Sequence, residues 1–117
     1  MSLNSAEPLI GQSWHIEQID DDAVLEGSLA TVNFDADGRL FGKASCNGYG
    51  GQYGVSDGVW RLSQMFTTKR LCEPALMRQE QAVLDRLRDT VRVDLAGDLL
   101  TLGTEDGRRL QARAVVE

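Results

Sequence analysis

The sequence predicts a mainly β protein of the α+β class, with a curved antiparallel sheet or small open barrel of about eight short strands. One helix, at about residues 74–89, is expected to pack against it. Three observations predict this fold. Short segments alternate apolar and polar residues, as strands with one buried face do. Turns containing glycine separate these segments. A single stretch has the three-and-four spacing of apolar residues that is typical of an amphipathic helix.

Five predicted strands precede the helix. Asp37-Gly38 and Asp57-Gly58 each separate two of them, and we expect type I′ hairpin turns because Asp-Gly readily adopts positive φ angles. Several glycines fall where a curving sheet needs bulges or close backbone approach. The predicted strands are residues 14–19, 30–34, 39–44, 51–55 and 59–65, and the glycines are Gly42, Gly48, Gly50, Gly51 and Gly54.

The predicted helix begins at Pro74, because the missing N–H of proline costs nothing in a first turn. Its apolar stripe has Glu80 as the one polar member, and we expect the other polar side chains to lie largely on the opposite side. The stripe is Leu76, Glu80, Val83, Leu84 and Leu87, and the polar side is Arg78, Gln79, Gln81, Asp85, Arg86 and Arg88. Three more strands, at about 91–95, 99–102 and 110–115, follow the helix and form a meander.

Size and charge limit the possible functions. The 117 residues fit one compact domain without room for a large site. A net charge of −6 and a pI near 4.7 argue against nucleic acid or an anionic membrane as a partner. The first 60 residues carry −7 of this charge, partly in the run Asp20-Asp21-Asp22, and the remainder carries +1. That run lacks the ligand spacing and glycine of a calcium loop, so we expect a solvated loop.

The first eight residues have no apolar pattern of their own. We expect residues 1–8 to be disordered or derived from cloning, and residues 9–116 to form the single domain. No stretch has the roughly 20 apolar residues that a membrane span needs.

The sequence contains no complete catalytic constellation. His15 is the only histidine, which excludes zinc sites built on several imidazoles, and we expect its ring to face solvent. Cys46 and Cys72 leave three alternatives: a disulfide, two free thiols, or a thiol nucleophile with His15 as its base. We therefore expect no enzyme activity, no cofactor and no metal.

Two segments together resemble a known family. Residues 44–53, ASCNGYGGQY, resemble the Gly/Ser-x-Cys-Asn-Arg-Tyr/Phe-x-Gly-x-Tyr signature of the META domain, the HslJ-like heat-shock protein family. Residues 67–72, TTKRLC, are similar to the Thr-Arg-Met-x-Cys segment of that family. The likeness extends over about residues 9–115, and the family implies a small antiparallel sheet or open barrel with a packed helix.

The resemblance implies site residues at the positions where this sequence matches the family motif. It implies a disulfide between Cys46 and Cys72, which match the two motif cysteines. Gly48 and Lys69 stand where the family usually has arginine. The loss of these arginines weakens the expectation that the motif binds an anion, and it affects the expectation of a structural role less. The positions taken as the structural or binding motif are Cys46, Asn47, Gly51, Tyr53, Thr68, Lys69 and Cys72.

The resemblance also implies a function: a non-enzymatic module of the bacterial cell envelope, linked to heat shock and to novobiocin tolerance. Its expected location is the periplasm or outer membrane, as a monomeric lipoprotein whose signal is absent from this sequence, with the cytoplasm as the alternative. An unknown envelope protein is the expected partner, and an accessory, pilot-like role in an outer-membrane or secretion assembly is one variant. A second alternative is an open barrel that binds a small apolar ligand or lipid, lined by Trp14, Phe34, Phe41 and Trp60.

Overall fold

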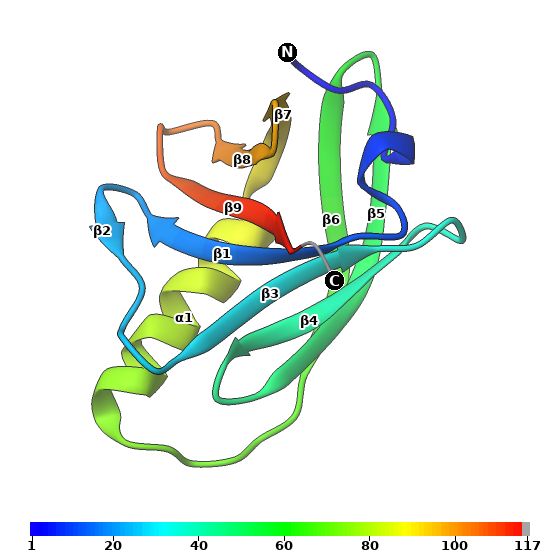
Figure 1. Ribbon diagram of the computed structural model, residues 1–117. Coiled ribbons are helices and arrows are strands. Elements are labelled where there is room, and N and C mark those ends of the chain that lie inside the picture. The colour runs from blue at the N-terminus through cyan, green and yellow to red at the C-terminus, as the bar shows by residue number, and fades with distance from the viewer. Residues whose placement is uncertain (116–117) are drawn as a thin grey trace.

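The computed structural model describes residues 1–115 and confirms a mainly β fold with one α-helix (Figure 1). A short 3₁₀ turn, η1, precedes the first strand. All eight predicted strands are present, each longer than expected by one to three residues at one or both ends, and the structure adds a two-residue strand. The elements are η1 (Glu7–Leu9), β1 (Ser13–Ile19), β2 (Asp22–Ala23), β3 (Leu29–Phe34), β4 (Arg39–Ser45), β5 (Gly48–Ser56), β6 (Val59–Thr67), α1 (Pro74–Arg88), β7 (Thr90–Ala96), β8 (Leu99–Thr104) and β9 (Arg109–Val115).

The strands form one antiparallel sheet in the order β6-β5-β4-β3-β1-β9-β8-β7, and β2 pairs with β1. The sheet curls so that its two end strands, β6 and β7, lie near each other. No ladder of hydrogen bonds joins these two strands in the described part of the chain. The result is a nearly closed barrel, as the sequence predicts.

The core fills the interior of this barrel, and α1 packs against β4, β6, β8 and β9. Its largest fully buried side chains include Trp14 and Trp60. Val83, Leu84 and Leu87 are the buried apolar residues of the helix. The prediction for Gln79 is wrong, because this side chain is buried rather than on the solvent side.

Hydrogen bonds to three distant groups explain the burial of Gln79. Its Oε1 accepts a hydrogen bond from the backbone N of Leu25 at 2.6 Å, and its Nε2 donates to Ser28 Oγ at 2.9 Å and to Ser45 Oγ at 3.1 Å. A buried amide is tolerated when its polar atoms are satisfied in this way. No helical periodicity indicates such partners, since they come from the loop before β3 and the end of β4.

The two Asp-Gly turns differ. Asp57 and Gly58 have φ angles of 52° and 77°, as the predicted type I′ turn requires. In the β3–β4 hairpin only Gly38 has a positive φ, of 84°, and Asp35 pairs with Arg39 across the loop. The type I′ prediction is wrong there, because a longer loop closes around the Asp35 carboxylate, which accepts from the backbone N of Asp37 and of Arg39.

A break in the β3–β4 ladder accounts for one motif tyrosine and one glycine. A Cβ on Gly42 would lie 2.2 Å from the carbonyl oxygen of Thr31, so only glycine allows the two backbones to approach there. The hydroxyl of Tyr49 donates to that same carbonyl oxygen at 2.6 Å, and the backbone N of Lys43 donates to Thr31 Oγ1 at 3.0 Å. Side chains thus replace the missing ladder bonds.

The N-terminal residues differ from the expectation of disorder. Leu3, Ala6 and Leu9 are buried within the core cluster, and residues 1–3 pair with the edge of β7. Buried apolar side chains and backbone hydrogen bonds therefore fix this segment on the barrel. The predicted domain range ends at residue 116, which lies outside the described residues.

The acidic run is more structured than a solvated loop. The carboxylate of Asp20 accepts hydrogen bonds from Arg86 Nη2 at 2.6 Å and from the backbone N of Arg109 at 2.9 Å. The Arg86 hydrogen bond is the main cause that lowers the pKa of Asp20 from 3.8 to about 2. Asp22 remains exposed and begins β2. The run therefore anchors the β1–β2 turn to α1 and β9.

Candidate functional site

Several predicted motif residues meet at one end of the barrel, where the β4–β5 turn faces the first half of α1. The carboxylate of Glu80 is buried there, with 5% of the residue exposed. Its Oε1 accepts hydrogen bonds from the backbone N of Cys46 at 3.0 Å and of Asn47 at 2.6 Å, and its Oε2 accepts from Asn47 Nδ2 at 2.8 Å. These bonds attach the turn to the helix.

Asn47 then connects the turn to the chain that follows β6. Its Oδ1 accepts hydrogen bonds from the backbone N of Arg70 at 2.6 Å and from Thr68 Oγ1 at 3.1 Å. Its Nδ2 also donates to the carbonyl oxygen of Arg70 at 3.1 Å. The amide of Asn47 is thus fully used, and substitution by a side chain of different shape would leave buried groups unpaired.

A disulfide between Cys46 and Cys72 completes this arrangement. The Cα atoms of the two cysteines are 6.3 Å apart, within the usual range, and the bond closes a sequence separation of 26 residues. The disulfide implied by the resemblance is therefore present. We call Cys46, Asn47, Thr68, Cys72 and Glu80 the motif cluster.

The remaining predicted site residues, Gly51, Tyr53 and Lys69, take no part in the hydrogen bonds of the motif cluster. A Cβ on Gly51 would lie 2.6 Å from Met65 Sδ and 3.0 Å from the carbonyl oxygen of Ser63, so a larger residue here would require the Met65 side chain to move. The ring of Tyr53 contacts Phe34 and Trp60, with centroid distances of 5.4 and 5.9 Å, and its hydroxyl donates to the carbonyl oxygen of Asp35. Burial is the main cause that raises the pKa of Tyr53, so the hydroxyl stays a donor. Lys69 is exposed.

Gly48 and Lys69, the two positions where this chain departs from the family pattern, contribute no side-chain bond to the motif cluster. A Cβ on Gly48 would have only the carbonyl oxygen of Gly42 nearby, at 3.7 Å, so this position opens outward. An arginine at position 48 would therefore extend over the surface without disturbing the motif cluster. The cluster does not depend on the two family arginines that this chain lacks.

Sequence reasoning partly missed Glu80. Its place in an apolar helical stripe indicated a buried polar group, but the stripe does not indicate what the carboxylate binds. The partners are backbone N–H groups of a turn more than 30 residues earlier in the chain. Tertiary contacts of this kind leave no local pattern.

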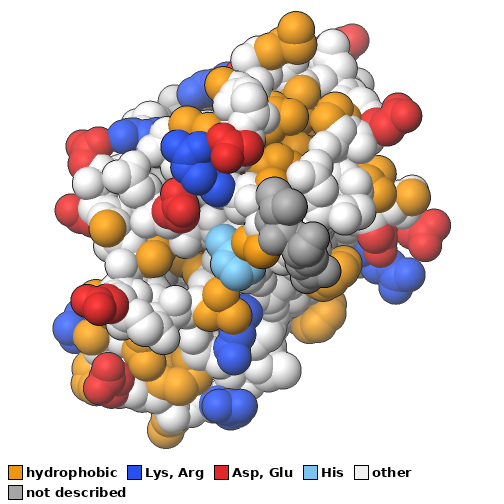
Figure 2. Space-filling view, in the orientation of Figure 1, with side chains coloured by type: hydrophobic (Ala, Val, Ile, Leu, Met, Phe, Trp, Pro, Cys, Tyr) orange, Lys and Arg blue, Asp and Glu red, His pale blue; other side chains and the backbone are white. Residues whose placement is uncertain are grey.

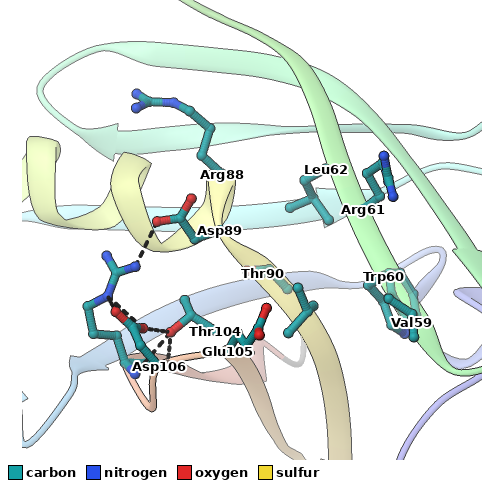
Figure 3. A pocket seen from close by; sticks show the side chains of 12 residues that line it. Val59, Trp60, Arg61, Leu62, Arg88, Asp89, Thr90, Thr104, Glu105 and Asp106 are labelled. Atoms are coloured by element: carbon teal, nitrogen blue, oxygen red, sulfur yellow. Dashed lines mark hydrogen bonds and ion pairs between the residues drawn. The ribbon is translucent and has the colours of Figure 1, made fainter.

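A hollow lies away from the motif cluster, between β6 and β7 (Figure 3). This seam groove has a volume of about 680 Å³. Arg108 crosses one wall and donates from Nη2 to Asp89 at 2.7 Å and from Nε to Asp106 at 3.0 Å. Hydrogen bonds from Thr104 and then Arg108 lower the pKa of Asp106. The groove is lined by Val59, Trp60, Arg61, Leu62, Arg88, Asp89, Thr90, Val91, Thr104, Glu105, Asp106 and Arg108.

The interior of the barrel holds core side chains. Trp14, Phe34 and Trp60, three of the four aromatic residues expected to line a ligand cavity, are 1–3% exposed and belong to the core cluster. The fourth, Phe41, is 49% exposed. These four side chains therefore do not surround one shared cavity.

Charged side chains are scattered over the visible face of the molecule, with positive and negative groups intermixed (Figure 2). Among residues 1–115, no group of three or more His, Cys, Asp or Glu side chains is placed to hold a metal ion. No helix in this range has both the length and the apolar character needed to cross a membrane. Both cysteines lie in the disulfide, so neither is a free thiol for a pair with His15.

These features define a class: a small, nearly closed antiparallel barrel whose sequence motif ties a turn, a helix and a loop together. Within this class the particular family is clear, because the META domain model matches residues 7–116. The chain belongs to the META domain family. No sequence among curated proteins matches it significantly.

Solved structures share the fold. The NMR structure of a protein from Burkholderia xenovorans has a TM-score of 0.77 at 21% identity, covering 96% of this chain and 87% of that one. A second NMR structure has a TM-score of 0.76 at 21% identity and covers 95% of both chains. The crystal structure of a DUF4847 family protein from Bacteroides vulgatus has a TM-score of 0.69 at 13% identity, covering 92% and 95%.

Proposed function

We propose that this META domain is a non-enzymatic interaction module of the bacterial cell envelope, acting in a stress response that includes heat shock and novobiocin tolerance. The observation that carries the proposal is the disulfide between Cys46 and Cys72, placed within the family motif. Disulfides persist in oxidising compartments such as the periplasm and are rare in the cytosol. The proposed location is the periplasm or the outer membrane, with a lipid anchor in the full-length protein.

Three features support a role in binding rather than catalysis. Both cysteines are joined to each other, so no thiolate nucleophile is present. The Glu80 carboxylate is occupied by three N–H donors of the β4–β5 turn. In the seam groove, Asp89 and Asp106 are both paired with Arg108.

The first test concerns the compartment. The chain is produced with and without an export signal, alkylated without reductant, and analysed by intact-mass spectrometry. The exported protein should carry no alkyl group and should gain two after reduction. Two alkylated thiols in the unreduced exported protein would contradict the proposal.

The second test concerns the role in the cell. The gene is deleted from its native bacterium, and growth is measured after a heat shift and across a novobiocin series. The deletion should lower both tolerances, and the exported wild-type chain should restore them. An antibiotic of unrelated target serves as the control. Unchanged tolerance to both heat and novobiocin in the deletion strain would overturn the stress assignment.

A further inference from the structure

The seam between β6 and β7 leaves two strand edges without a ladder between them. Antiparallel pairing alternates, so every second residue of an edge strand turns its backbone N–H and C=O away from its neighbour. The registers with β5 and β8 place the outward-facing groups at Trp60 and Leu62 on β6 and at Val93 and Leu95 on β7. Residues 1–3 bind those of Val93 and Leu95. The seam therefore presents hydrogen-bonding groups that suit an added strand.

One short segment of the chain already occupies part of this seam. The backbone N of Leu3 donates to the carbonyl oxygen of Val93 at 2.8 Å, and the N of Leu95 donates to the carbonyl oxygen of Met1 at 3.0 Å. Ser2 and Asp94 form an antiparallel bridge, and Leu3 is 8% exposed within the core cluster. Residues 1–3 thus act as a short strand added to β7.

The indole of Trp60 shows that the seam requires a carbonyl group. Trp60 is 1% exposed, and its Nε1 donates to the carbonyl oxygen of Leu3 at 2.8 Å. An indole N–H can only donate, and leaving it buried without an acceptor is unfavourable. The second tryptophan, Trp14, satisfies its own N–H with the carbonyl oxygen of Leu9, away from the seam.

The seam extends beyond the three residues that fill it. After Leu3 the chain leaves β7 and forms η1, while the direction Met1 to Leu3 points along β7 toward Val91 and the seam groove. β7 has seven residues, so a longer extended segment can pair with it. The groove walls carry both a positive residue, Arg61, and a negative one, Glu105, so they do not favour a ligand of one charge. We therefore expect recognition by backbone hydrogen bonds and by an aliphatic side chain in the position of Leu3.

We propose that the β6–β7 seam is a strand-accepting site that binds an extended segment of a partner polypeptide antiparallel to β7. An aliphatic side chain of the partner takes the pocket of Leu3, and a partner carbonyl accepts from Trp60 Nε1. Residues 1–3 are then the competing occupant. The inference rests on the proposed role as an interaction module and names its site.

The test begins with the full chain carrying Leu3→Asp, which disfavours the seated segment. In NMR spectra, the indole N–H of Trp60 should shift and lose protection from hydrogen exchange, while that of Trp14 stays unchanged as an internal reference. The probe is a peptide with the sequence of residues 1–6, MSLNSA. Added to this variant, it should restore the Trp60 signal.

Two controls locate the binding. The same peptide with Asp at its third position should bind at least about tenfold more weakly, because its side chain cannot enter the apolar pocket. The wild-type chain should also bind MSLNSA at least about tenfold more weakly than the variant, because its own residues compete. Equal binding to wild type and variant, or no restoration at millimolar peptide, would overturn the site.

A second variant covers the case in which Leu3→Asp does not fold. Trp60→Phe keeps an aromatic ring but removes the N–H donor. Exchange of the Leu95 amide should become several-fold faster, while the core amide of Leu100 keeps its rate. An unchanged Leu95 rate would contradict the proposed role of Trp60. These outcomes are distinguishable from the stress phenotype, which tests the proposed function without reference to the seam.

Discussion

The motif cluster and the seam groove are two regions of one barrel that use their polar groups differently. In the motif cluster, one carboxylate, one amide and one disulfide join the β4–β5 turn to α1 and to the segment after β6. In the seam groove, two strand edges face each other without a ladder. The comparison indicates that the motif residues link three segments of the fold, whereas the seam leaves a groove between two strand edges.

The largest expected effect comes from Glu80→Ala, which tests whether the motif cluster holds the fold. The change leaves three buried N–H donors without their acceptor. We expect a loss of roughly 4 kcal/mol in the free energy of unfolding, measured by urea denaturation. Glu73→Ala is the matched control, because Glu73 is exposed and makes no side-chain capping bond. Equal losses in both variants would contradict the prediction.

The disulfide should have the next largest effect. Replacing both cysteines, as Cys46→Ser with Cys72→Ser, removes a covalent loop with a sequence separation of 26 residues. The loop-entropy model gives a loss of about 3.5 kcal/mol in unfolding free energy. Thermal unfolding of the wild-type chain with and without reductant measures the same quantity independently. If reduction left the melting temperature unchanged, the covalent link would not stabilise the fold.

A smaller effect is expected at Asp20, which lies outside both regions. Its ion pair with Arg86 gives a reference value for the stabilisation by a partly exposed ion pair in this protein. Since the pKa of Asp20 is lowered in the folded chain, from 3.8 to about 2, its stabilisation is complete above about pH 5 and is lost as the pH falls toward 2. Its side chain is 36% exposed, so solvent screening reduces the contribution to roughly 1 kcal/mol.

Denaturation of Asp20→Asn at pH 7 and at pH 3 measures this contribution. The loss relative to wild type should be larger at pH 7. Asp22→Asn, at an exposed neighbouring position, should change stability little at either pH. A deficit in Asp20→Asn that grows on acidification would have the wrong sign for a carboxylate that is stabilised in the folded state.

The smallest effect is expected on the wall of the seam groove. Arg61 is exposed and forms no ion pair among residues 1–115. Arg61→Ala should therefore change the unfolding free energy by less than about 0.5 kcal/mol. Calorimetry would detect a larger loss, which would mean that this wall supports the fold as the motif cluster does.

The parts of the fold that were predictable from sequence depend on local patterns. Alternation located the eight main strands, Asp57-Gly58 indicated its turn type, and Pro74 marked the start of the helix. The β3–β4 turn was not predictable, because its loop is shaped by the Asp35 carboxylate rather than by Asp-Gly alone. The two-residue strand β2 is too short for any alternation to show.

The candidate site was less predictable, because its contacts join residues that are far apart in the sequence. The motif resemblance indicated the cysteine pair, and the apolar helical stripe indicated that Glu80 is buried. Neither indicates that the carboxylate binds the turn at Asn47. The pairing of Leu3 with Val93 joins residues 90 positions apart. Contacts of this length depend on how the sheet closes, which no short segment encodes.

The position of the disulfide has a mechanical consequence. The bond between Cys46 and Cys72 encloses the whole β5–β6 hairpin, so a force applied to the two chain ends bypasses that hairpin. With a separation of 26 residues and the two Cα atoms 6.3 Å apart, the oxidised chain should extend about 85 Å less than the reduced chain when it is fully stretched. The hairpin beside the seam would thus keep its covalent closure even while the rest of the barrel is pulled apart.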